Sequence, residues 1–196
     1  MNQSTFIIII YLTFICSTKG YGKYTFIEDT TTTKEFLSTW EMFSKAIISN
    51  DQTKFKELSL ESIYCTDCVT NTTTEDSIFK NFENNNPNTW YEKLYDEFSY
   101  ILIDRFLKED YSLIFNSKIH KHIIDHKKVV FLHREIDGAM LLKNYSQVSF
   151  KNAVTNIQEV LLTHIEPTPQ YEGSQIALQF IETKEGYKFF GYSTIP

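Results

Sequence analysis

The chain has 196 residues, of which 42% are hydrophobic and 15% aromatic, so it carries enough apolar side chains for the core of one globular domain. Plentiful aromatic residues and moderate charge exclude an intrinsically disordered chain. The formal net charge is −6 and no run of five basic residues occurs, which argues against a general nucleic-acid-binding protein, because such proteins need clustered cations to displace phosphate counterions.

The N-terminus predicts export. Residues 6–15 form an uncharged apolar run, followed by small or polar residues up to Gly20. This run is too short to cross a bilayer, which takes about 20 helical residues, but it fits the apolar region of a secretory signal. We therefore expect residues 1–20 to be a signal peptide. Residues 21–196 should form a single periplasmic or secreted domain without a transmembrane helix.

Two alternatives to a cleaved signal are considered. The apolar run could be a buried N-terminal strand, and Cys16 could carry a lipid anchor. The three residues before Cys16 lack the small residue that lipoprotein processing normally needs. Cleavage near Gly20 is therefore favoured over lipidation.

Two helices are expected at the start of the domain. Thr32 with Glu35 matches a capping box, in which a hydroxyl and a carboxylate each accept a hydrogen bond from a backbone N–H at the helix start. Asn50-Asp51 ends this helix near Ser49 and can cap a short second helix through Leu58. The first helix carries four large apolar residues at spacings of four, three and four, which indicates one buried stripe: Phe36, Trp40, Phe43 and Ile47.

The middle of the chain is expected to contain turns and helices. Residues 61–71 are predicted to be a turn-rich connection. A short helix should begin at Thr73 or Thr74 and end before residues 84–88, where Pro87 and four asparagines favour a turn. Apolar spacing then predicts a longer helix over about residues 94–108 and a weaker one over residues 113–124.

The last third of the chain predicts strands. A short β-rich run covers residues 129–132, with a turn signal at Asp137-Gly138, and three further strands are predicted at residues 155–165, 175–183 and 187–194. Ile176, Leu178 and Phe180 alternate onto one face, and the short connections imply antiparallel neighbours. The predicted fold class is α+β, with N-terminal helices packed on a curved C-terminal antiparallel sheet.

Three stretches carry a resemblance to a known superfamily: the amphipathic helix at residues 36–51, KFKELS at residues 54–59, and IETKEGYKFFGYSTIP at residues 181–196. This order of helices and sheet resembles the nuclear transport factor two-like superfamily, with its cystatin-like cone fold. The ending is also similar to those of small uncharacterised exported bacterial proteins. The resemblance implies a fold and no activity, because this fold hosts enzymes, binding modules and structural domains. No catalytic residue is carried over.

Cys65 and Cys68 form a CxxC pair. A local disulfide is expected in the oxidising compartment that export implies. A four-cysteine zinc site needs a second pair, which the sequence lacks. Thioredoxin-like chemistry needs the first cysteine at a helix start that follows a strand. We predict a structural disulfide, with metal binding and redox chemistry as the alternatives.

Three histidines, His120, His122 and His126, form HxHxxxH. His122 and His126 would share one helical face, whereas His120 points away from His122. Nearby lysines would also repel a cation. A solvated helix end is therefore favoured over a metal site.

Two His–carboxylate pairs are candidates for general-base chemistry. His133 with Glu135 and His164 with Glu166 each alternate onto one face of a predicted strand, where such a pair could lie in a pocket. The same alternation also describes the solvated face of a half-buried strand, which is the favoured interpretation.

The expected function is binding of a small ligand or a protein partner through the concave face of the sheet, by a non-enzymatic exported domain without a cofactor or metal. Phe189, Phe190 and Tyr192 could line such a pocket, although packing in the core is the favoured interpretation of these residues. One alternative is a hydrolase- or isomerase-like enzyme that uses His164 with Glu166. Another is an inhibitor or interaction protein acting through an edge strand or acidic surface, and a homodimer is a further option. The sequence contains no Gly-rich phosphate loop, HExxH or GxSxG.

Overall fold

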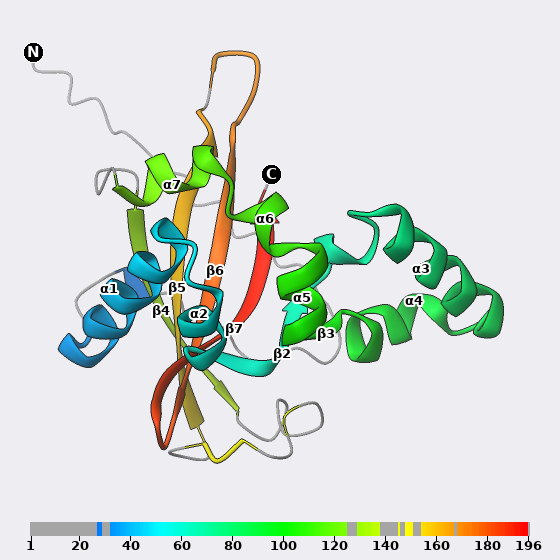
Figure 1. Ribbon diagram of the computed structural model, residues 1–196, viewed down its shortest axis with the longest axis horizontal. Coiled ribbons are helices and arrows are strands. Elements are labelled where there is room, and N and C mark those ends of the chain that lie inside the picture. Colours follow the sequence, from blue (N-terminus) through cyan, green and yellow to red (C-terminus); the bar gives the residue numbers. More distant parts are fainter. Residues whose placement is uncertain are drawn as a thin grey trace, which may run out of the picture.

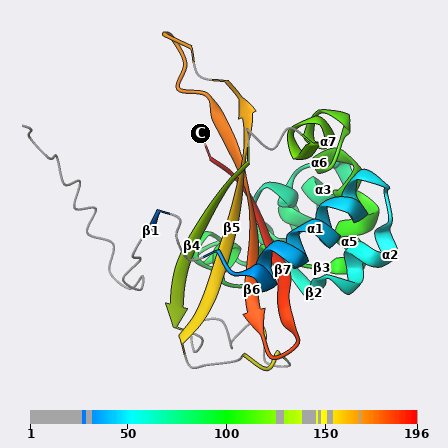
Figure 2. The same cartoon turned by 90° about the vertical axis from the view of Figure 1, so that its left-hand side faces the viewer.

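The computed structural model describes residues 27–28, 32–124, 129–137, 145, 148–150, 154–166 and 168–195. Within these residues the strands pair into one twisted sheet in the order β1-β4-β5-β6-β7-β2-β3 (Figure 1, Figure 2). The predicted signal peptide, Cys16 and Gly138 of the predicted turn lie outside the described residues. The strands are β1 (Ile27–Glu28), β2 (Ser59–Cys65), β3 (Tyr100–Leu102), β4 (Val129–Asp137), β5 (Val154–Ile165), β6 (Ser174–Thr183) and β7 (Gly186–Ile195).

Most helices cover one face of this sheet, while α3 and α4 project sideways from it (Figure 1, Figure 2). The predicted α+β class is confirmed. No helix in the described part of the chain combines the length and apolarity needed to span a membrane. The helical elements are α1 (Lys34–Ile48), α2 (Gln52–Glu57), the 3-10 turn η1 (Asp67–Val69), α3 (Thr73–Asn85), α4 (Trp90–Lys93), the π-helical turn η2 (Leu94–Phe98), α5 (Ile103–Glu109), α6 (Tyr111–Ile114) and α7 (Ser117–Ile124).

The start of α1 differs by one residue from the prediction. The Thr33 hydroxyl accepts a hydrogen bond from the Phe36 backbone N–H at 3.1 Å, and the helix begins at Lys34. The predicted capping box between Thr32 and Glu35 is therefore wrong. With Thr33 as the cap, the third helical position is Phe36, which has no carboxylate to return the hydrogen bond.

The predicted stripe of α1 packs onto the sheet as expected. Ring centroids of Phe43 and Phe180 lie 4.8 Å apart at nearly a right angle, and Trp40 contacts Phe180 in the same edge-to-face manner. Such contacts add to the area burial that drives core formation. The stripe residues are all buried: Phe36, Trp40, Phe43 and Ile47. The sheet side is the predicted antiparallel meander of β5, β6 and β7, which is confirmed, together with β4, which pairs antiparallel with β5.

The turn-rich connection predicted over residues 61–71 is wrong in its first half, because β2 continues to Cys65. This strand pairs in parallel with β7 and antiparallel with β3. Its partners therefore lie far away in the sequence, and Ser59, Glu61 and Ser62 interrupt any regular apolar alternation along it. The sheet is consequently mixed: antiparallel over the predicted meander, and parallel where β2 meets β7.

The long helix predicted over residues 94–108 is also wrong, because strand β3 interrupts it. The N–H and the hydroxyl of Ser99 both donate to the Leu94 carbonyl, at 2.9 and 2.7 Å, which closes η2. The Ser99 carbonyl accepts the Cys65 N–H at 2.8 Å. β3 then pairs with β2, so residues that fit a helical pattern satisfy their backbone groups in the sheet. The helix predicted over residues 113–124 is divided in two: α6 ends at Ile114, Phe115 leaves the helical conformation, and α7 begins at Ser117.

The opposite face of the sheet carries a smaller apolar cluster. Alternation along the strands and the register shifts in β2, β6 and β7 direct these side chains away from the helices. Its buried members are Leu60, Tyr145, Ile157, Ile181 and Phe190. Both faces of the central strands are therefore apolar, which explains why Ala177 and Ile181 are as buried as their neighbours.

Candidate functional site

A cavity of about 340 Å³ lies where the ends of β5, β6 and β7 meet η1, α6 and α7. Part of its wall is the main core, through Ile114, Ile119 and Ile176. An apolar wall with a few convergent polar groups is typical of small-molecule sites, and the volume lies near the lower end of their range of about 300–1,000 Å³. The polar side chains of the lining are Asp67, Asn71, Asn116, His164, Tyr192 and Thr194.

The CxxC segment positions one wall of this cavity. Cys65 and Cys68 are buried and lie at disulfide distance, with Cα atoms 5.4 Å apart, in agreement with the predicted disulfide. Between them, Oδ2 of Asp67 accepts the Thr194 backbone N–H at 2.8 Å. The short covalent loop and this hydrogen bond together tie η1 to the end of β7.

Two neutral polar side chains, His164 and Tyr192, line the cavity together with the Asp67 carboxylate. Burial, and then the positive charge of Lys118, lower the pKa of His164, so its imidazole is neutral at pH 7. Its Nδ1 is buried and has no hydrogen-bond partner within the described residues. Burial, and then the charge of Asp67, raise the pKa of Tyr192 to about 12, so its hydroxyl keeps its proton.

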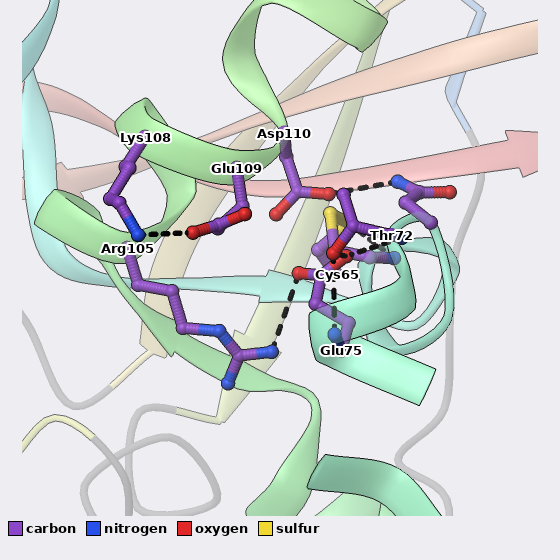
Figure 3. Close-up of polar contacts among 9 residues, drawn as sticks. Cys65, Thr72, Glu75, Arg105, Lys108, Glu109 and Asp110 are labelled. Carbon is purple, nitrogen blue, oxygen red and sulfur yellow. Dashed lines mark hydrogen bonds and ion pairs between the residues drawn. A yellow bond between two sulfur atoms is a disulfide. The ribbon is translucent and has the colours of Figure 1, made fainter. Parts of the chain in front are cut away.

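Two buried carboxyl groups, Glu75 and Asp110, lie close together (Figure 3), and Asn71 of the cavity lining contacts Asp110. Asn71 Nδ2 donates to Asp110 Oδ1 at 2.8 Å, and a guanidinium nitrogen of Arg105 lies 3.3 Å from Glu75 Oε1. Asp110 Oδ2 has no hydrogen-bond partner among the described residues. Because a buried oxygen without a donor is costly, the arrangement favours a proton on Asp110 that faces Glu75.

Glu75 also fixes the start of α3. Its Oε2 accepts hydrogen bonds from the backbone N–H and the hydroxyl of Thr72, both at 3.1 Å, and its own N–H donates to the Thr72 hydroxyl at 3.2 Å. This is a complete capping box. The T-x-x-E pattern at residues 72–75 is the sequence signal that could have located it.

Burial raises the pKa of Asp110 to about 7. The hydrogen bond from Asn71 and the charge of Arg105 oppose this shift, whereas the charge of Glu75 adds to it. The Asp110 side chain is fully buried, so a molecule in the cavity would meet Asn71 and not Asp110. We therefore regard this pair as a support of the cavity wall. Sequence reasoning missed it because a polar residue in a short helical connection gives no local sign of burial.

The structure separates the site residues that the sequence suggested. His164 and Tyr192 line the cavity, whereas Glu166 lines another cavity of about 370 Å³ at the connection between β5 and β6. His164 and Glu166 are thus not brought to a common site. Phe189 belongs to the main core and Phe190 to the smaller cluster on the opposite face.

The other candidate histidines are also placed. His133 Nδ1 lies 2.9 Å from Gln158 Nε2, while Glu135 is exposed. His120 and His122 lie in α7, and His126 is outside the described residues. Within the described ranges, no group of three His, Cys, Asp or Glu residues is placed to hold a metal ion.

Comparison of the chain with protein-family models, curated proteins and solved structures finds no match.

Proposed function

We propose that this protein is an exported, non-enzymatic binding domain that holds a small ligand in the cavity between η1, β7 and α7. The observation that carries the proposal is the cavity itself, in which one apolar wall faces a set of polar side chains. A volume of about 340 Å³ suits a small molecule better than a peptide. The disulfide loop and the bond between Asp67 and Thr194 hold the polar wall in place, which favours binding because little ordering is then needed.

The lining favours a ligand with an apolar body and a hydrogen-bond donor, such as an amine. Asp67 supplies a carboxylate, and Tyr192 and His164 are uncharged at neutral pH. An ammonium group would be attracted to Asp67, and the apolar part could contact Ile114 and Ile176. A ligand carboxylate would instead be repelled by Asp67.

Two further parts of the proposal concern kinship and export. Helices over one face of a twisted sheet support kinship with the nuclear transport factor two-like superfamily, although the parallel pairing of β2 with β7 was not part of that resemblance. The apolar run at residues 6–15 supports export. The enzymatic alternative receives no support from the placement of His164 and Glu166 on different cavities.

The test uses three probes that share one apolar ring: cyclohexylmethylamine, cyclohexylmethanol and cyclohexanecarboxylate. Binding to the mature chain is measured by NMR titration. We expect the amine to bind most tightly and the carboxylate most weakly. Asp67→Asn should abolish the preference for the amine over the alcohol, because the amide can still accept the Thr194 N–H but carries no charge.

The matched control is Glu166→Gln, which removes a carboxylate from the other cavity and should leave the order of affinities unchanged. Thr194→Phe should weaken all three probes by occupying the rim. The proposal fails if none of the probes binds, or if binding of the amine is the same in wild type, Asp67→Asn and Thr194→Phe.

A further inference from the structure

The helical hairpin formed by residues 73–98, here called the aromatic arm, contributes almost no side chains to the core. It comprises α3, the following turn, α4 and η2, and it extends sideways from the sheet (Figure 1). Every residue of the arm is described, and Glu75 at its base is its only buried side chain. The arm is therefore a projection whose surface is available to a partner.

The arm nevertheless contains many aromatic rings. Phe82 stacks on Phe98 with ring centroids 4.3 Å apart, and Phe79 packs against both of these rings. Trp90 in turn packs edge-to-face against Phe79. None of these four rings is fully buried. They stabilise the hairpin through contacts with one another, and they form the inner part of a continuous aromatic surface.

Two tyrosines extend this surface into solvent. Tyr91 is 60% exposed and Tyr95 is 38% exposed, and their ring centroids are 5.4 Å apart. Tyr91 also contacts Trp90 edge-to-face at 5.6 Å. Tyrosine and tryptophan are enriched among the residues that dominate the energy of protein interfaces, so adjacent exposed rings point to a docking surface.

The charge of the arm indicates what such a partner carries. Residues 76–98 contain five carboxylates and two lysines. Lys80 pairs with Asp76 at 2.6 Å, and Lys93 donates to Asn86 at 2.8 Å. Glu92 and Glu97 are exposed on the same short segment as Tyr91. The aromatic surface is thus bordered by net negative charge.

We propose that the aromatic arm docks a polypeptide segment in which arginines alternate with apolar residues. A guanidinium group can stack on a tyrosine or tryptophan ring and at the same time pair with a neighbouring carboxylate, which an ammonium group does less well. A second copy of this chain is a poorer occupant, because two net negative arms would face each other. An anionic membrane is disfavoured for the same reason. This interaction is separate from ligand binding in the cavity.

The test measures fluorescence anisotropy of labelled twelve-residue peptides titrated with the mature chain. One peptide alternates arginine with leucine, a second replaces each arginine with lysine, and a third with glutamate. We expect the arginine peptide to bind most tightly and the glutamate peptide not to bind. The double substitution Tyr91→Ser with Tyr95→Ser should weaken the arginine peptide by at least about tenfold.

Two further variants separate this surface from general acidity. Glu92→Gln with Glu97→Gln should weaken binding and reduce its dependence on salt. Tyr171→Ser, at a tyrosine that is 48% exposed on the connection between β5 and β6, should have no effect. The proposal is overturned if the arginine peptide does not bind, or if it binds Tyr91→Ser with Tyr95→Ser as tightly as it binds Tyr171→Ser. It is also overturned if sedimentation shows a dimer that Tyr91→Ser with Tyr95→Ser dissociates.

Discussion

Asp110 is a buried carboxyl group of which only one oxygen has a hydrogen-bond donor within the described part of the chain. Asn71 donates to this oxygen, and the other has no hydrogen-bond partner among the described residues. Glu75 and its partner Arg105 lie close by (Figure 3). Deprotonation places a second negative charge beside Glu75 in a poorly solvated position, with one guanidinium group to offset both. The protonation of this one side chain is therefore tied to the packing around it.

Asp110→Asn should stabilise the protein above neutral pH and change its stability little in mild acid. The folded pKa of about 7 lies above the unfolded value of about 4. The folded state therefore binds more protons between these values, and the contribution of Asp110 to stability falls as the pH rises from about 4 to about 7. Asparagine can accept from Asn71 and donate to Glu75 at every pH. Urea unfolding should show a gain of about 2–4 kcal/mol at about pH 8.

Asp104→Asn is the control for this experiment, because the Asp104 side chain is 75% exposed. Its carboxylate pairs with Lys56 and not with Asn71 or Glu75, so this substitution should not produce the gain in stability that Asp110→Asn gives at about pH 8. If the stability difference between Asp110→Asn and wild type were the same at about pH 5 and about pH 8, Asp110 would not titrate as inferred.

At the scale of elements, α1 is specified by its own residues, whereas β2 is specified by the strands beside it. The stripe of α1 repeats with the period of a helix, and the residues that it contacts on β6 alternate with the period of a strand. β2 has no comparable pattern, and its position depends on β7 and β3. The first kind of element can be predicted from its own residues, whereas the second depends on its neighbours.

Trp40→Ala should destabilise the protein by about 3–5 kcal/mol, because it leaves a cavity between α1 and the sheet. Trp40 contacts Phe43 on its own helix and Phe131 and Phe180 on the sheet. Chemical denaturation monitored by circular dichroism would measure the loss. Leu37→Ala, at a side chain that is 42% exposed on the same helix, should stay within about 0.5 kcal/mol of wild type. Equal effects of the two substitutions would contradict this packing.

At the scale of the whole molecule, the cavity and the aromatic arm share one support. Asn71 lines the cavity and binds Asp110, which lies beside Glu75, and Glu75 caps the helix from which the arm begins. The two proposed binding surfaces are therefore joined through a few buried polar residues. Both surfaces would be accessible to extracellular or periplasmic molecules if the chain is exported.

The expected export predicts a shortened N-terminus in the native host. Mass spectrometry of the purified protein should find a mature chain that starts between about Ser17 and Lys23. Ile8→Arg should retain the protein in the cytosol, because a charge interrupts the apolar run, whereas Ser4→Arg adds a charge before that run and should leave export intact. An intact Met1 on soluble cytosolic protein would contradict export.

The sequence by itself determined the elements whose signals are local. These are the apolar stripe of α1, the cap of α2 at Asp51, the antiparallel meander, and the pairing of Cys65 with Cys68. Apolar periodicity, capping residues and the three-residue separation of the two cysteines can each be recognised within one turn or one strand.

Only the tertiary structure decided the position of β2 and β3, the cavity and the buried carboxyl pair. Asp67 and Asn71 follow β2, whereas His164 lies at the end of β5. They meet because β2 and β5 lie on the two sides of β6 and β7. Burial of Asp110 likewise depends on what α3 and α5 place around it. Composition does not predict these tertiary contacts, because strand pairing and burial depend on residues that are remote in the chain.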